Sequence, residues 1–173
     1  QACTMAHMAH TGITAQTSRR RPQLCRLSGA GRPAAGASSR GATSSTVGGT
    51  AAGAGNIVAF SGQGGVWTSG IAISGTSTTG DAVLGNTIYG SVGQGIDLGT
   101  QGVTANDAAP DSDTGANNLQ NFPVLATART NASNQLIVTG TLTSAANSYY
   151  RIEFFANTSP DATGYGEGQT YLG

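Results

Sequence analysis

The chain has 173 residues, enough for one domain or two small ones, and glycine contributes 27 of them. Charged residues make up only 9%, the net charge is zero, and every basic residue other than histidine is an arginine. Helix formers such as Lys and Glu are scarce while Gly, Ser, Thr and Asn are abundant, which favours an all-β fold dense in turns. The sequence has no apolar run of 18 residues, so no membrane-spanning helix is predicted.

Residues 1–45 differ from the remainder in composition and charge. Six of the eight arginines lie at or before Arg40, whereas all eight acids lie at or after Asp81. The segment has no usable hydrophobic periodicity, so we predict a disordered arm over residues 1–45 that does not pack on the body. A nucleic-acid-binding arm is one alternative, but the acidic body lacks the clustered Lys and Arg of such proteins, and no nucleic-acid partner is expected.

Residues 46–104 repeat a short phrase, a glycine followed by an apolar–x–apolar triplet. The phrase reads GIAI at residues 70–73 and GIDL at residues 95–98, a separation of 25 residues. Each triplet is too short for a helix and alternates like a strand, and a fixed period of this size is typical of a solenoid. A flexible glycine-rich linker is the alternative, but linkers do not keep apolar pairs in register.

Stacked parallel strands follow from this period, because one such strand cannot bury its apolar face alone. The predicted arrangement is about two coils, with Ile71, Ile73, Ile96 and Leu98 in one core and Ala72 and Asp97 facing solvent. The Gly-Asn pairs at 55–56 and 85–86 are 30 residues apart, which fits the same period with a five-residue insertion at 66–70. Parallel stacking then places Asn56 beside Asn86, where their amides can hydrogen-bond.

Residues 105–123 leave the repeat and form an acidic exit linker in this interpretation. Acids and an amide alternate around Gly115, a spacing that supplies oxygen ligands to calcium. The glycine is one place early for an EF-hand and no glutamate follows at the twelfth position, so a solvated turn with Asx caps is the alternative. The predicted weak calcium ligands are Asp107, Asp111, Asp113 and Asn117.

Residues 124–173 alternate like strands of a β-sandwich. We predict an antiparallel hairpin that joins the run beginning at Leu136 to Tyr150–Phe155 through the turn Ser144–Ser148. Along this run Tyr150, Ile152 and Phe154 alternate with Arg151, Glu153 and Phe155. A further strand is predicted at 169–172. Only three to four strands are present, fewer than a complete sandwich requires.

These phrases together resemble a known family. The stretches TVGGTAAGAGNIV (46–58), GNTIYG (85–90) and 93–125 are similar to the last coils and exit segment of bacterial right-handed parallel β-helix repeat proteins, which are surface-exposed or secreted. The stretch 136–173 is similar to the immunoglobulin-like module that follows the helix in large multidomain members. The resemblance implies an all-β chain: a remnant of a right-handed parallel β-helix, then a partial immunoglobulin-like β-sandwich. It also favours a fragment of a longer protein.

Catalytic chemistry is not indicated. Residues 46–173 contain no Lys or His, and glycoside hydrolysis requires two facing carboxylates. The position one period before Asp97 is Ala72, which supplies no second acid, and Asp81 belongs to another side of the coil. No catalytic residue is therefore assigned, and no cofactor beyond weakly bound calcium is expected.

The resemblance implies adhesion, display or carbohydrate contact at an extracellular or cell-surface location. Trp67 and Tyr89 are the candidate contacts, since aromatic faces stack on sugar rings; Trp67 capping the thin core is the alternative. The expected partners are a carbohydrate or surface polymer and neighbouring domains of a longer chain. The alternative function is the non-catalytic terminal part of a β-helix polysaccharide lyase or glycoside hydrolase.

Overall fold

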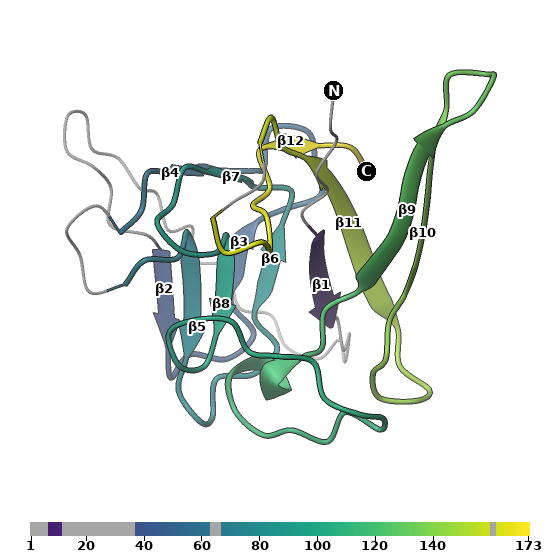
Figure 1. Ribbon diagram of the computed structural model, residues 1–173. Coiled ribbons are helices and arrows are strands. Elements are labelled where there is room, and N and C mark those ends of the chain that lie inside the picture. Colours follow the sequence, from purple (N-terminus) through teal and green to yellow (C-terminus); the bar gives the residue numbers. More distant parts are fainter. Residues whose placement is uncertain (1–6, 12–36, 63–66, 160–161) are drawn as a thin grey trace.

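The computed structural model describes residues 7–11, 37–62, 67–159 and 162–173, and these residues are mostly β-structure (Figure 1). A short 3-10 segment, η1 (Ala116–Leu119), interrupts the long connection between β8 and β9. The strands are β1 (His7–Thr11), β2 (Ala37–Arg40), β3 (Thr46–Gly48), β4 (Ile57–Ala59), β5 (Ile71–Ser74), β6 (Ala82–Leu84), β7 (Thr87–Tyr89), β8 (Ile96–Leu98), β9 (Val124–Thr130), β10 (Leu136–Thr141), β11 (Tyr150–Ala156) and β12 (Thr170–Tyr171).

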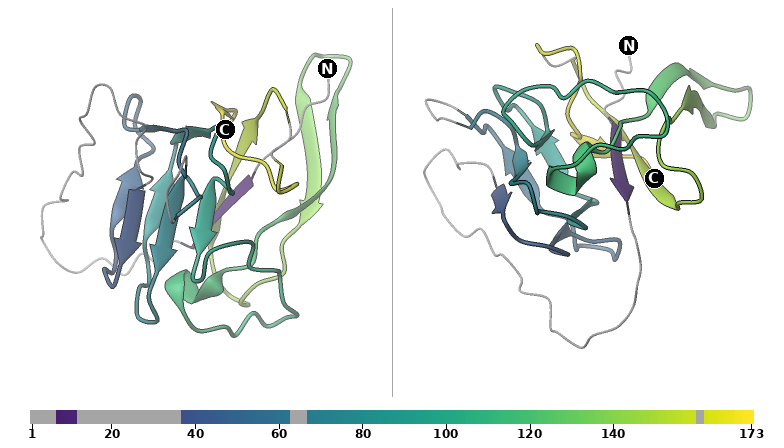
Figure 2. Two further views of the ribbon diagram at one scale, coloured as in Figure 1. Left: turned by 60° about the vertical axis from the view of Figure 1, so that its left-hand side comes forward. Right: turned by 90° about the horizontal axis from the view of Figure 1, so that it is seen from below.

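The strands between β2 and β8 pair in parallel in three short sheets. The first sheet holds β2, β5 and β8, the second β3 and β6, and the third β4 and β7. The chain thus passes through the three sheets in one order twice and returns to the first sheet with β8. Figure 2 shows the strands of the first sheet side by side.

The register between β5 and β8 confirms the predicted 25-residue offset, whereas Ala37 pairs with Ile71 and Thr46 with Ala82, offsets of 34 and 36 residues. Ile71 pairs with Ile96 and Ile73 with Leu98, and Asp97 is the partner of Ala72. In the third sheet the offset is 30 residues, with Ile57 opposite Thr87. The side chain of Asn56 donates to the Oδ1 atom of Asn86 at 3.0 Å, as the stacking predicts.

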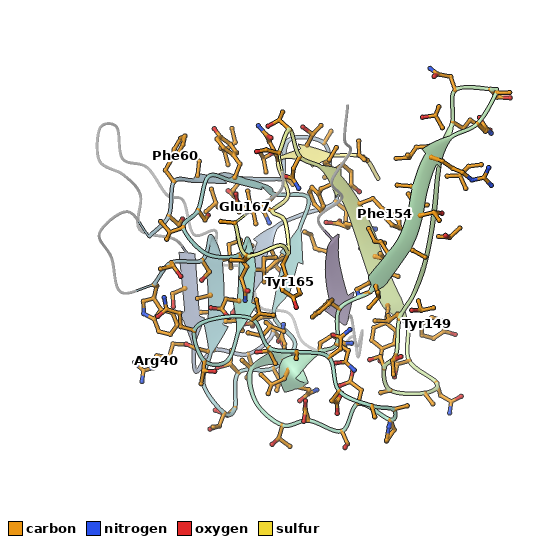
Figure 3. All side chains as sticks on the ribbon, in the orientation of Figure 1. Arg40, Phe60, Tyr149, Phe154, Tyr165 and Glu167 are labelled. Atoms are coloured by element: carbon orange, nitrogen blue, oxygen red, sulfur yellow. The ribbon has the colours of Figure 1, made fainter. Side chains whose placement is uncertain are left out.

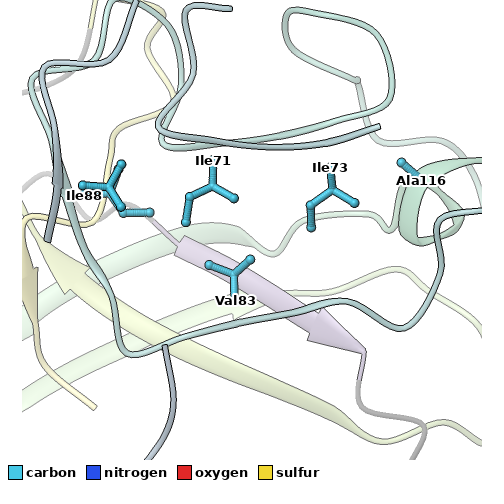
Figure 4. Close-up of a cluster of buried hydrophobic side chains, with 6 residues drawn as sticks. Ile71, Ile73, Val83, Ile88 and Ala116 are labelled. Atoms are coloured by element: carbon cyan, nitrogen blue, oxygen red, sulfur yellow. The ribbon is translucent and has the colours of Figure 1, made fainter. Parts of the chain in front are cut away.

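Apolar side chains from all three sheets meet in one thin core (Figure 4). Ile71 and Ile73 are buried there, and Ile96 and Leu98 pack against the cluster while remaining half-buried, so the predicted core set is confirmed. The second and third sheets supply further buried side chains, and η1 supplies one at the end of the core. These additional members are Val58, Val83, Ile88 and Ala116.

The prediction of an unpacked arm is wrong for two parts of residues 1–45; the rest of that segment lies outside the described residues. Strand β2 pairs with β5 through four residues, and β1 pairs antiparallel with β11. The Ser39 hydroxyl and the Ser45 amide also donate to the carboxylate of Asp81 at 2.6 and 2.8 Å. Strand pairing uses backbone groups, so the sequence ASSR joins a sheet without any apolar signature.

The predicted solvent-facing positions in the first sheet are buried instead. Ala72 and Asp97 are each 3% exposed. The chain after β8 folds back, and Asp97 accepts hydrogen bonds from the Gly102 amide at 3.1 Å and from Gln94 Nε2 at 3.0 Å. The period-two pattern located the face of the strand correctly, but it carried no information about the loop that covers it.

The strands after residue 123 form antiparallel sheets with a different pairing from the one predicted. Strand β10 pairs with β9 and β11 pairs with β1 and β12, so the predicted hairpin between β10 and β11 is wrong. The further strand expected near the end is present as β12. In β11 Glu153 and Phe155 are 2% and 0% exposed, while Ile152 and Phe154, at the alternate positions, are half-buried.

Candidate functional site

An acidic cluster forms in the connection between β8 and β9. One carboxylate oxygen from each of Asp107, Asp111 and Asp113 lies within 4.8 Å of the others. The chain turns between Asp107 and Asp111, where the Asp111 amide donates to the carbonyl of Ala108 at 3.2 Å, and so side chains two to six residues apart in the sequence come together. Three of the four predicted calcium ligands therefore meet, and their oxygens are the ligand type that hard cations prefer.

The fourth predicted ligand, Asn117, has its side-chain amide engaged with the backbone of Asp81. Its Nδ2 atom donates to the backbone oxygen of Asp81 at 2.7 Å, and its Oδ1 atom accepts the Asp81 amide at 2.9 Å. The side-chain amide of Asn117 thus bonds to both backbone polar groups of Asp81, as a neighbouring strand would. Because Asn117 is 8% exposed and both amide atoms are occupied, it fastens η1 to the parallel sheets.

Neutral donors hold two of the three carboxylates in place. Asn121 Nδ2 donates to Asp107 Oδ1 at 2.9 Å, and the Asn121 Oδ1 atom accepts the Asp107 amide at 3.0 Å. The Ser144 hydroxyl donates to Asp111 Oδ2 at 2.6 Å. These bonds offset part of the repulsion between like charges. Sequence reasoning missed Asn121 and Ser144, since neither lies in the alternating motif.

The two predicted carbohydrate contacts differ in their surroundings. Trp67 is 41% exposed, while Tyr89 is half-buried in β7. The ring of Tyr89 meets that of Phe60 edge to face, with 5.6 Å between centroids and an interplanar angle of 80°. Phe60 lies against Gly90, where a Cβ atom would come within 2.9 Å of the Phe60 ring. Phe60 was missed because it follows the repeat triplet.

The outer face of the third sheet carries exposed apolar side chains. Val58 and Ile88 point into the core, so their neighbours Ile57 and Tyr89 point outward from paired strands. Ile57 is 73% exposed and Phe60 is 55% exposed, and Figure 3 shows Phe60 at the outer side of this part of the molecule. We name Ile57, Phe60 and Tyr89 the outer apolar face.

Asp97 is a buried acid at the last strand of the first sheet. Burial raises the pKa of Asp97, and the hydrogen bonds from Gly102 and Gln94 act in the opposite direction. The Gly102 bond holds the chain that folds back after β8, and Gln94 Nε2 also donates to the Gly102 carbonyl at 3.0 Å. Asp97 therefore stabilises the loop that follows β8.

Comparison of the chain with protein-family models, curated proteins and solved structures finds no match. Within the described ranges, no helix has the length and apolar character needed to cross a membrane.

Proposed function

We propose that the chain is a non-enzymatic part of a bacterial extracellular or cell-surface repeat protein that contacts carbohydrate through its outer apolar face. In this proposal residues 37–98 are coils of a right-handed parallel β-helix, and the strands from β9 onward begin an immunoglobulin-like module. Two passes through three parallel sheets, in one order and with aligned core residues, support the β-helix.

The outer apolar face is the observation that carries the contact role. Solvent-facing positions of a stacked sheet do not need apolar residues for folding, yet Ile57, Phe60 and Tyr89 occupy this surface. Exposed apolar patches commonly mark binding sites. The apolar C–H faces of pyranose rings pack on aromatic rings, and Thr87, the β7 partner of Ile57, offers its hydroxyl group to sugar hydroxyls.

Glycan binding to the intact chain tests this role. We expect binding to a subset of glycans on an array, with Tyr89→Ala and Phe60→Ala each weakening it about tenfold, the equivalent of roughly 1.4 kcal/mol. Tyr149→Ala is the matched control, because Tyr149 is 91% exposed and lies on the opposite side of the view in Figure 3. Trp67→Ala tests whether the second predicted aromatic contributes.

Two results would overturn the proposal. One is the absence of any bound glycan, and the other is equal binding by the Tyr89 and Tyr149 variants. Release of reducing ends or unsaturated products from pectin, alginate or xylan would contradict the non-enzymatic part, and we expect none with or without calcium.

A further inference from the structure

The last strands of the second and third sheets present a continuous edge. Among the described residues β6 pairs only with β3 and β7 only with β4, so the opposite edge of each strand is open to a further partner. Along this edge the amides of Gly85, Ile88 and Ser91 recur every three residues. Unpaired edge amides are sites where another strand can add.

The C-terminal segment satisfies all three amides. Gly85 N donates to Glu153 Oε2 at 2.8 Å, and Ser91 N donates to Glu167 Oε1 at 2.9 Å. Between them Ile88 N donates to the carbonyl oxygen of Gly168 at 2.8 Å in an antiparallel bridge. Two carboxylates and one carbonyl thus stand where a neighbouring strand would place its carbonyl groups.

Both glutamates are buried at this contact. Glu153 is 2% exposed and Glu167 is 9% exposed. A buried carboxylate is costly unless it is hydrogen-bonded, and bonds to an ionised acceptor are stronger than neutral ones. Glu153 is also paired with Arg151 Nε at 2.9 Å through its other oxygen. The burial of two acids against edge amides indicates a dedicated contact.

The segment is shaped to present these acceptors together. Asn157 Nδ2 donates to the backbone oxygen of Glu167 at 2.7 Å, and the Gln169 amide donates to Asn157 Oδ1 at 3.0 Å. The fully buried ring of Phe155 lies against Gly168, where a Cβ atom would approach it to 3.1 Å. Figure 3 shows Glu167, in the segment between β11 and β12, over the parallel strands.

We infer that β11, β12 and residues 162–169 form a cap that occupies the β6–β7 edge and prevents a second copy of this chain from stacking there. Strands β3 and β4 of another copy are the fitting partners, because the same strands already pair in parallel with β6 and β7 within one chain. Strand β2 of that copy would stay unpaired, because β8 already pairs with β5. Such contacts are head-to-tail and do not close, so uncapped copies would form open stacks. This inference does not depend on carbohydrate binding.

Removing the two carboxylates from the full chain tests the cap. In the double variant Glu153→Ala, Glu167→Ala we expect hydrogen exchange at Gly85, Ile88 and Ser91 to quicken at least tenfold. Protection at Ile71 and Ile73 should remain, which shows that the core is folded. Sedimentation velocity over a roughly hundredfold range of concentration should show reversible association that the wild type lacks.

Two controls distinguish the cap from a general loss of stability. Glu153→Gln with Glu167→Gln keeps an acceptor at each position and should stay close to wild type in exchange and in mass. Asp113→Ala removes an acid outside the segment and should not promote association. If the double alanine variant does not fold, Glu167→Ala alone should speed exchange at Ser91. Unchanged exchange at the edge amides, or a double variant that exchanges quickly yet stays monomeric, overturns the inference.

Discussion

Asparagine side chains take the place of missing strand partners at several points, and Asn86 is the most buried example. Its Oδ1 atom accepts the Asn56 amide at 2.9 Å, and its Nδ2 atom donates to the carbonyl of Val47 at 2.8 Å. Asn86 is fully buried, so a lost partner there is not replaced by water. Gly-Asn repeats in the sequence allowed this stacking to be predicted, although not the bond to Val47.

Asn86→Ala should therefore lower the free energy of unfolding by about 1–3 kcal/mol, because it leaves the Asn56 amide and the Val47 carbonyl unsatisfied. Asn56→Ala should cost less, since the Asn56 backbone amide keeps its bond to Asn86. Chemical denaturation of both variants measures the difference. Equal losses in the two variants would contradict the assigned roles.

Asp97 is expected to make the free energy of unfolding depend on pH. Burial raises the folded-state pKa of Asp97 above its unfolded value, so the native state holds its proton more tightly. Stability from this group is therefore fully present below the unfolded pKa and is lost as pH rises through the folded pKa. Asp97→Asn removes this titration, so the stability of the variant relative to wild type should increase with pH across that window.

Asp97→Ala separates the charge of this residue from its hydrogen bonds. It leaves Gly102 N without its acceptor and removes one of the two bonds that Gln94 Nε2 donates, and we expect a loss of about 1–3 kcal/mol. Thermal unfolding of both Asp97 variants from acid to neutral pH is the measurement. A stability difference between wild type and Asp97→Asn that is independent of pH would contradict the raised pKa.

At the scale of the strand, alternation separates interior from exterior positions on paired strands. Ile88 is fully buried in β7, whereas Ile57 in the neighbouring β4 is 73% exposed. Ile88→Ala should lower the free energy of unfolding by about 2–5 kcal/mol through lost burial and a cavity. Ile57→Ala should change it by about 0.5 kcal/mol or less. Denaturant unfolding of the pair checks this, and a similar loss in both would refute the inward and outward assignment.

The sequence allowed prediction of the strands that carry a repeated apolar triplet, and less of the others. The triplets at Ile71 and Ile96 gave both register and core face, because one period places them opposite each other. Strand β2 went unrecognised, since its pairing depends on backbone groups. The burial of Glu153 in β11 was not predicted, because it depends on a bond to the amide of Gly85, which is distant in the sequence.

In the acidic candidate site, too, local spacing predicted some contacts but not those between residues distant in the sequence. Alternate spacing brought Asp107, Asp111 and Asp113 to one place, since a single turning segment carries all three. Asn117 has the same spacing but bonds to Asp81, a contact over 36 residues that no local pattern encodes. On the outer apolar face, Tyr89 was predicted as a contact residue. Its partner Phe60 was not, because the position of the Phe60 ring depends on residue 90 being a glycine.

At the scale of the whole molecule, the acidic cluster joins the exit of the parallel sheets to the C-terminal strands. Ser144 follows β10 and bonds to Asp111, and Asn121 Nδ2 also donates to the carbonyl of Thr143 at 3.1 Å. The connection that leaves the sheets at residue 98 is thus held against the segment between β10 and β11. Charge repulsion within the cluster opposes this junction.

Asp113→Asn should stabilise the chain by about 1 kcal/mol or less, because it removes one of three like charges that lie within 4.8 Å of one another. The gain should shrink with added salt, because salt screens the repulsion among the three carboxylates of the wild type. Ser112→Ala is the local control and should change stability little. Thermal unfolding at low and high salt measures both variants, and a gain that is unaffected by salt would contradict repulsion as its cause.

Thermal unfolding with added calcium tests the weak calcium binding predicted from the sequence, here at Asp107, Asp111 and Asp113. Millimolar calcium should raise the Tm of the wild type and leave that of Asp113→Asn almost unchanged. Equal shifts in both proteins, or none in the wild type, would remove the calcium hypothesis and leave the cluster as an electrostatic cost at the junction.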